Sequence, residues 1–393
     1  MAVLATGAVL LGAGCSGEKT PSWEGGGSGA ATQGRNGAGE ESPVSPPSIA
    51  SPVSGSSGVE ALEPVRFTGG DMPNTAVTVK GADGQEVDGK TDTAKGTWTP
   101  AKGLAWGKTY TVTVSTPGLE GRTTTAESSF TVMTKPANLV RVTSFLADNS
   151  QVGVAMPLIV QFGRSVPEKY RAEVERQMPV TASPVQEGTW HWYSGTEVHY
   201  RPKEYWTPGT KLTYNANLKG VPMGDRWYGR SNLDVDVEVG RSFVMTVDNN
   251  SKKMQVRENG KLIQTIPVSL GKPSTPSSSG TTVVMEKKRH TVFDTIAELG
   301  PDQGYRTDID YAQRLTWGGE FIHAAPWSEG VQGRSNVSHG CVNVSMKMGA
   351  WLFARTRMGD PVTVTGTGRK LQQGNGFTDW SLSWDEYLKG SAL

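Results

Sequence analysis

Short segments that alternate apolar and polar residues, separated by glycine-rich turns, fill most of this 393-residue chain. Glycine occurs 49 times and proline 23 times, while apolar residues make up 36%. A period of two places successive side chains on opposite faces of a strand, and frequent turns keep the strands short. The sequence therefore predicts a mostly β protein with modest cores, and its length suggests two or three folded domains.

Charge is nearly balanced, with 39 Lys and Arg residues against 38 Asp and Glu residues. A protein dedicated to nucleic acid needs a basic excess to displace counterions from phosphates. We therefore expect no nucleic-acid partner, and look for the function in individual residues.

The chain begins with an apolar run, from Ala2 to Leu11, which is followed by small residues and then Cys15. This run is too short to span a bilayer but has the length of a signal-peptide core. It resembles a bacterial lipoprotein signal. The resemblance implies that Cys15 is lipidated, becomes the new N-terminus after cleavage and anchors the protein in the membrane. A plain secretory signal is the alternative. In both cases residues 1–15 form the signal region, and we expect an extracytoplasmic protein.

Changes in composition divide the rest of the chain into five segments. Residues 16–60 are rich in Gly, Ser, Ala and Pro and too poor in apolar side chains to offset the entropy of ordering, so we expect a flexible tether. Alternating segments then predict two immunoglobulin-like β-sandwiches, at 61–135 and 136–240. A third, β-rich domain spans 241–368. The aromatic residues of 369–393 predict a Trp-bearing tail packed on that third domain.

A loose sequence signature is common to the two predicted sandwiches. The residues Pro100, Trp106, Gly107 and Tyr110 recur approximately as Pro202, Trp206, Gly209 and Tyr214. Neither sandwich contains a plausible catalytic cluster, and His191 and His199 stand on strands without partners nearby in sequence. We therefore expect both modules to act as a spacer.

Two histidines and a cysteine stand close together in the third domain. Residues 321–327 read F-I-H-A-A-P-W, and residues 338–343 read S-H-G-C-V-N. A free cysteine is mostly protonated near neutral pH, so a nucleophilic thiol needs a base or a positive neighbour. His323 is the first choice of base for Cys341. The domain's one main helix, expected to begin after Ser345, would favour the thiolate further.

The residues around the thiol also allow other chemistry. Gly340 lets the backbone turn sharply, so that the N–H groups of Gly340 and Cys341 could face a developing oxyanion. A zinc site made of His323, His339 and Cys341 is the alternative, since three N or S ligands can hold a catalytic zinc ion. No further His, Asp or Glu follows at ligand spacing, and we therefore expect neither a metal nor a cofactor.

Together, the run at residues 338–343 and His323, eighteen positions before Cys341, resemble the signature of the L,D-transpeptidase catalytic domain, the YkuD family. The order of signal, tether, two immunoglobulin-like modules, catalytic domain and tail resembles the actinobacterial members. The resemblance implies a cysteine thioester acyl-enzyme that cross-links third-position diamino acids of peptidoglycan. It also implies stem peptides as donor and acceptor, and carbapenem-type β-lactams as covalent inhibitors.

The resemblance also assigns roles to single residues. Cys341 matches the nucleophile, and His323 matches a general base that the backbone carbonyl of Ala324 orients. His339 and Gly340 match the oxyanion-hole segment. The residues that it places in substrate binding are Tyr305, Gly318, Gly319, Trp327, Ser338, Asn343 and Met285.

Two other functions stay open on the sequence. An L,D-carboxypeptidase would hydrolyse the same thioester, and the choice depends on water exclusion and acceptor docking, which the sequence does not reveal. A cell-wall-binding lipoprotein without turnover would use only its immunoglobulin-like modules.

Overall fold

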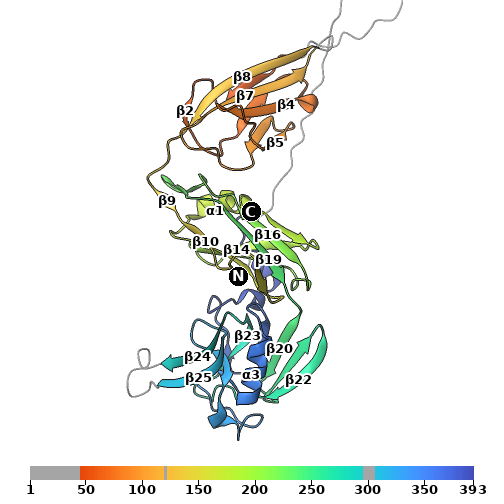
Figure 1. Ribbon diagram of the computed structural model, residues 1–393, viewed down its shortest axis with the longest axis vertical. Coiled ribbons are helices and arrows are strands. Elements are labelled where there is room, and N and C mark those ends of the chain that lie inside the picture. The colour runs from red at the N-terminus through yellow and green to blue at the C-terminus, as the bar shows by residue number, and fades with distance from the viewer. Residues whose placement is uncertain (1–44, 119–121, 295–305) are drawn as a thin grey trace, which may run out of the picture. The chain divides into compact units, whose positions relative to one another are not determined.

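The computed structural model describes residues 45–118, 122–294 and 306–393 (Figure 1). The fold is mostly β, which confirms the predicted fold class. Within these ranges no helix is both long enough and apolar enough to cross a membrane.

The first module consists of two four-stranded sheets around one apolar core. One sheet has the order β1 (Ser48–Ser51), β3 (Val65–Thr68), β6 (Thr97–Pro100) and β5 (Gly89–Asp92). The other has the order β2 (Ser57–Val59), β8 (Thr123–Val132), β7 (Thr109–Pro117) and β4 (Ala76–Gly81), and a short 3-10 helix η1 (Met72–Asn74) precedes β4. Trp98 and Phe130, one from each sheet, are buried in the shared core.

Strands β1 and β2 lie inside the stretch that was predicted to be a tether. They pair with β3 and β8, and Ile49 and Val59 pack against the first core. The prediction of a flexible segment was therefore wrong for residues 48–59. An added edge strand gains backbone hydrogen bonds from an existing sheet, so it needs few apolar side chains. The predicted signal, Cys15 and the tether up to residue 44 lie outside the described residues.

The second module is also a sandwich. One sheet has the order β10 (Val142–Ser144), β12 (Leu158–Phe162), β15 (Glu197–Pro202) and β14 (Gly188–Trp192). The other has the order β11 (Ser150–Val152), β19 (Leu233–Val239), β16 (Lys211–Ala216) and β13 (Val180–Ser183). A small sheet of β17 (Pro222–Gly224), β18 (Trp227–Gly229) and β9 (Leu139–Val140), with helix α1 (Glu168–Arg176), completes it. Gly107 and Gly209 of the shared signature correspond structurally, because both have positive φ. The Gly107 N–H donates to Met133, directly after β8, and the Gly209 N–H donates to Val239, the last residue of β19.

The third domain contains a six-stranded and a four-stranded sheet. The larger has the order β22 (Lys261–Pro267), β21 (Lys253–Glu258), β20 (Phe243–Asp248), β28 (Pro361–Thr365), β23 (Ser278–Val283) and β29 (Arg369–Lys370). The smaller has the order β24 (Glu286–Asp294), β25 (Arg306–Arg314), β26 (Phe321–Ala324) and β27 (Val342–Val344). Helix α3 (Met346–Arg355) contacts β25 and β26, and the Ser345 hydroxyl accepts from the Met348 N–H as the predicted N-cap.

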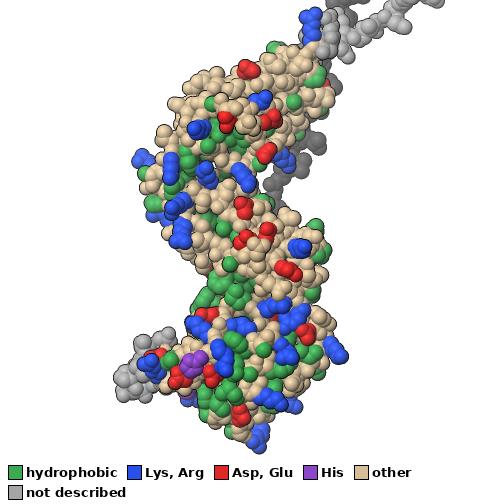
Figure 2. Space-filling model, in the orientation of Figure 1, with side chains coloured by type: hydrophobic (Ala, Val, Ile, Leu, Met, Phe, Trp, Pro, Cys, Tyr) green, Lys and Arg blue, Asp and Glu red, His purple; other side chains and the backbone are tan. Residues whose placement is uncertain are grey.

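The β24–β25 hairpin was not predicted from the sequence. Charged residues and a histidine gather on it (Figure 2), and His290 Nδ1 lies 3.2 Å from the Asp310 carboxylate across the pair. Most side chains of β24 are exposed or half-buried, so the apolar alternation that indicates a strand is missing.

The tail, residues 369–393, packs on the second sandwich as well as on the catalytic domain. Its 3-10 helix η4 (Asp379–Ser381) contacts β23, and its helix α4 (Trp384–Leu388) contacts β14. Trp380 Nε1 donates to the carbonyl of Ala155 at 2.7 Å, and the Arg201 guanidinium lies 4.4 Å from the centroid of the Trp380 ring. The predicted tail contact is thus shared between two domains.

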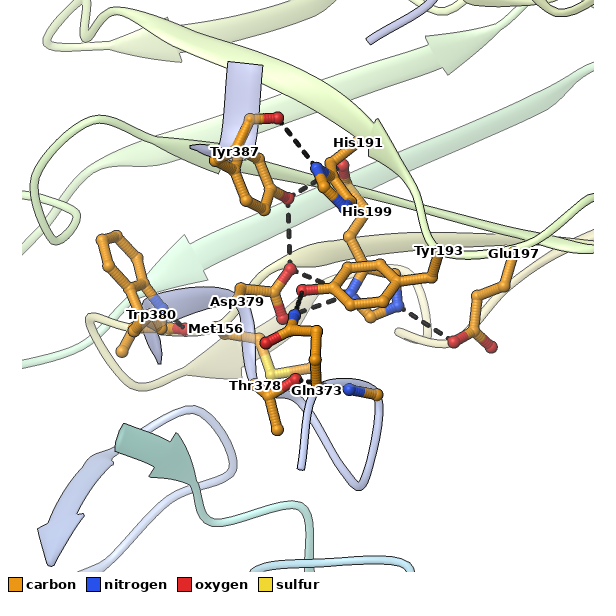
Figure 3. A network of polar contacts seen from close by, with 12 residues as sticks. Met156, His191, Tyr193, Glu197, His199, Gln373, Thr378, Asp379, Trp380 and Tyr387 are labelled. Atoms are coloured by element: carbon orange, nitrogen blue, oxygen red, sulfur yellow. Dashed lines mark hydrogen bonds and ion pairs between the residues drawn. The ribbon is translucent and has the colours of Figure 1, made fainter. Parts of the chain in front are cut away.

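A buried ion pair lies where the tail meets the second sandwich (Figure 3). His199 Nδ1 is 3.0 Å from the Asp379 carboxylate, and His199 Nε2 is 3.1 Å from that of Glu197. The Tyr387 hydroxyl donates to Asp379 at 3.1 Å. Burial alone would lower the pKa of His199, but the two carboxylates outweigh it and raise the pKa to about 9. His199 is therefore charged near neutral pH, and it ties strand β15 to the tail.

The His199 pair makes stability depend on pH. Folding raises the pKa of His199 above the unfolded value of about 6.5. The ion pair therefore contributes its full stabilisation of the folded protein below about pH 6.5. That stabilisation is lost as the pH rises through about 9. We expect the urea midpoint of the wild-type protein to fall between pH 6 and pH 9.5, and that of His199→Gln to fall much less. Equal pH slopes for the two proteins would contradict the assignment.

Candidate active site

Two short parallel strands bring the predicted nucleophile and base to one place. In the β26–β27 pair His323 is opposite Asn343, and Cys341 directly precedes β27. Cys341 and His323 are both buried, and both line one pocket. Residues at alternate positions share a face of a strand. The sheet therefore directs Cys341, Asn343 and His323 to the same side.

Other predicted site residues surround this pocket and a second pocket beside it. The first pocket is lined by His323, Trp327, Ser338, His339, Cys341 and Asn343 together with Phe293, Thr307, Ile309 and Val337. The second pocket includes Gly318, Gly319, Trp317, Glu320, Arg369 and again Phe293 and His339. The β24–β25 hairpin therefore contributes Phe293 to both pockets.

His323 is held in its neutral form. Its Nδ1 lies 2.8 Å from the carbonyl oxygen of Ala324, which can only accept, so Nδ1 carries the proton and Nε2 keeps its lone pair. Burial lowers the pKa of His323, while the backbone contact with Ala324 partly offsets this shift. The Trp327 ring lies 5.9 Å from the imidazole, centroid to centroid, at the exposed rim. The resemblance implied this contact between the imidazole and the Ala324 carbonyl.

The surroundings of the Cys341 thiol favour its protonated form. Burial raises its pKa to about 12, a backbone hydrogen bond from Phe321 lowers it in part, and the charge of Glu320 raises it. The sulfur lies 3.6 Å from the carbonyl oxygen of Gly319, to which the S–H donates. The net effect of the surroundings on the thiol is therefore a raised pKa, although the helix after Ser345 was expected to favour the thiolate. Strand β27 separates the thiol from the helix, and a helix terminus acts mainly over its first turn.

The turn before the thiol differs from its predicted role as a pair of oxyanion donors. Gly340 has φ +133, as a sharp turn requires. Its N–H donates to the Ser338 hydroxyl at 3.1 Å, and that hydroxyl donates to the Cys341 carbonyl at 2.7 Å. The Gly340 N–H is therefore engaged within the turn. Ser338, which was predicted to bind substrate, here closes the loop that presents the thiol.

His339 lies beside Lys272 and lines both pockets. The Lys272 ammonium lies 3.1 Å from His339 Nε2, and an ammonium can only donate. Burial lowers the pKa of His339, and the Lys272 charge lowers it further. Both effects keep His339 neutral.

One of the predicted substrate residues, Met285, does not line the thiol pocket, and another cannot be placed. Met285 is fully buried in the core that includes Phe377, and it lines neither pocket. Tyr305 lies outside the described residues. Asn343, in contrast, lines the Cys341 pocket, and its amide donates to the Ser328 hydroxyl at 3.3 Å.

Several residues that support the site were not predicted. The Ser277 hydroxyl donates to the Gly340 carbonyl at 2.6 Å, and the buried Glu320 carboxylate accepts from both the N–H and the hydroxyl of Ser278. Ser277 stands in a serine-rich stretch in which no single residue is marked, so the sequence offers no signal for it. Across residues 45–118, 122–294 and 306–393, no three His, Cys, Asp or Glu side chains come together as a metal site.

Comparisons with known proteins agree with this geometry. Residues 242–364 match the L,D-transpeptidase catalytic domain, YkuD, and residues 56–222 match a bacterial Ig domain. The chain is 33% identical to L,D-transpeptidase 2 of Mycobacterium tuberculosis over 351 residues, covering 88% of this chain and 85% of that protein. It is 32% identical to L,D-transpeptidase 5 of the same species, covering 87% and 76%. A solved LD-transpeptidase in complex with imipenem is 33% identical, with a TM-score of 0.50, over 58% of this chain and 100% of that one.

The raised pKa of the Cys341 thiol predicts low reactivity toward simple alkylating agents. In Cys15→Ser protein, iodoacetamide should modify Cys341 at pH 8 at least about a hundredfold more slowly than it modifies N-acetylcysteine, because little thiolate is present. The rate should still rise between pH 8 and pH 10. The urea-unfolded protein is the control, and it should react like the small thiol. A rate that levels off by pH 8 in the folded protein would show a thiolate and contradict this prediction.

Proposed function

The chain belongs to the family of L,D-transpeptidases with a YkuD catalytic domain, and we propose that it joins stem peptides of peptidoglycan through a thioester on Cys341. One observation supports the assignment of roles most directly. His323, with Nδ1 tied to the Ala324 carbonyl, and the buried Cys341 thiol line one pocket on paired strands. A neutral imidazole with a free Nε2 lone pair can accept the thiol proton as the sulfur attacks.

In the first half-reaction the sulfur attacks the carbonyl carbon of the third stem residue, and its proton passes to His323 Nε2. The carbon–nitrogen bond to the terminal D-alanine then breaks, and the imidazolium returns the proton to the leaving amine. The product is a thioester between the stem and Cys341. Because the resting pair is neutral, charge appears only as the substrate binds and excludes water.

In the second half-reaction the side-chain amine of a diamino acid in a second stem attacks the thioester carbon. The carbon–sulfur bond breaks, the amine proton passes through His323 to the sulfur, and an amide cross-link between two third-position residues remains. We assign the Cys341 N–H as the oxyanion donor, because the Gly340 N–H is bonded to Ser338. Trp327, Asn343 and His339 line the pocket in which the donor stem would lie.

We also propose that Cys15 is lipidated and that the protein acts at the outer face of the membrane. The apolar run from Ala2 to Leu11 before this cysteine supports the proposal. A relative that covers 58% of this chain has been solved in complex with imipenem, and carbapenems are therefore the inhibitor class that we expect to acylate Cys341. The disaccharide-linked stem dimers released from digested cell wall would distinguish cross-linking from hydrolysis.

Replacing the nucleophile tests the chemistry. Cys341→Ser should lose imipenem adduct formation, detected by intact mass, and stem-dimer formation by more than about a thousandfold. An alkoxide is far harder to generate than a thiolate. Its melting temperature should stay close to that of the wild type, because the exchange is nearly isosteric. Continued dimer formation by this variant would refute the proposed nucleophile.

Replacing the base tests the proton transfer. His323→Ala should lower the acylation rate by roughly 10²- to 10⁴-fold. Since burial lowers the pKa of His323, the wild-type acylation rate should decline only below about pH 6.5. His339→Ala is the matched control and should retain this acid limb. If His339→Ala loses the limb and His323→Ala keeps it, the two roles are reversed.

A further inference from the structure

Consecutive residues of the tail contact the loop that precedes strand β26. This loop, residues 315–320, is here named the thiol loop. Asn375 Oδ1 accepts from the Gly318 N–H at 2.7 Å. The Phe377 ring meets the Trp317 ring edge-on, with 5.8 Å between centroids. The tail therefore fixes both the backbone and a side chain of this loop.

Gly376, between these two residues, fits against the loop without spare room. It has φ +107, and a Cβ at this position would stand 2.7 Å from the Leu315 carbonyl oxygen and 3.0 Å from Met285 Sδ. Only glycine permits this approach. Met285 therefore packs against the tail at Gly376.

The same loop contacts the thiol on its other side. The Gly319 carbonyl accepts from Cys341 S–H at a sulfur–oxygen distance of 3.6 Å. Gly319 has φ +87, and its N–H donates to the Thr316 carbonyl at 3.3 Å. The backbone group that Asn375 holds is therefore one residue from the oxygen that contacts the reactive sulfur.

The ends of the thiol loop are fixed without the tail, because Leu315, Thr316 and Glu320 are buried and hydrogen bonds join residues 315 and 316 to Glu320. Its tip is formed by residues 317–319. Gly318 and Gly319 have no side chains to pack, and such residues lose the most conformational entropy on ordering. Trp317 is 53% exposed. An external constraint on the Gly318 N–H thus has a larger effect at this tip than it would at a tip with buried side chains.

The tail is itself anchored close to this contact. Asp379, four positions after Asn375, forms the buried pair with His199 of the second sandwich (Figure 3). Two residues further on, the Ser381 hydroxyl accepts from the Thr281 N–H and donates to the Thr281 carbonyl, both at 2.9 Å. Asn375 is thus presented to the loop from a segment held on two domains.

We propose that Asn375 is a positioning residue for acyl transfer, which acts through Gly318 and Gly319 to fix the sulfur of Cys341. This inference rests on the proposed role of Cys341 as the nucleophile. The Gly319 oxygen selects one side-chain rotamer of the cysteine, while the hydrogen on sulfur is free to turn toward His323 when a substrate carbonyl arrives. A released loop lets the sulfur leave the attack position, and misplacement of about 1 Å costs up to about a hundredfold in rate.

The test compares full-length Asn375→Ala and Asn375→Asp with Gln372→Ala, each in Cys15→Ser protein. Gln372 is an exposed amide of the same tail segment. Asn375→Ala should lower the maximal rate of imipenem acylation about tenfold. The half-saturating concentration should stay within about twofold, and the melting temperature within a few degrees. Asn375→Asp keeps the accepting oxygen and should recover most of the rate, and Gln372→Ala should match the parent.

A second readout separates positioning from general damage. Iodoacetamide should modify Cys341 at least about threefold faster in Asn375→Ala, because the thiol loses the cover of the loop while acylation becomes slower. Acylation and alkylation unchanged from the parent would overturn the inference, and so would equal losses for the Ala and Asp variants. Absence of any adduct on the parent protein would instead refute the proposed function, and the alkylation rates would still decide the role of Asn375.

Discussion

The parallel pairing of β26 with β27 is the constraint on which the active site depends. Its register sets His323 opposite Asn343 and places Cys341 at the start of β27. Two residues eighteen positions apart in sequence thus line one pocket, and the strand register fixes their relative positions. The Ala324 carbonyl on β26 then fixes which nitrogen of the imidazole is the base.

Burial has opposite consequences for the two partners and makes them a neutral pair. It raises the pKa of the Cys341 thiol and lowers that of the His323 imidazole, so the proton stays on sulfur until a substrate arrives. A neutral thiol resists oxidation and stray electrophiles. The same pair depends on a glycine-rich loop whose support comes from the tail, which the His199–Asp379 ion pair ties to the second sandwich. The sandwich therefore does more than act as a spacer.

Much of the fold and of the chemistry could be predicted from local signals. The alternation of apolar and polar residues predicted a mostly β fold, and the helix expected after Ser345 begins at Met346. The β24–β25 hairpin was missed because no side chain of β24 is buried, so this strand lacks the apolar alternation that indicates a strand. Contacts such as that of Asn375 with Gly318 join distant segments and leave no periodic pattern. The raised pKa of the thiol arises from three-dimensional burial, which the sequence does not encode locally.

The protonation state of His323 in the resting protein tests the neutral pair most directly. Long-range ¹⁵N–¹H spectra distinguish the two imidazole nitrogens, and His323→Gln identifies the signals among the five histidines of the chain. At pH 7 we predict a protonated Nδ1 and an unprotonated Nε2. Protonation of both nitrogens, with a thiolate on Cys341, would contradict the account.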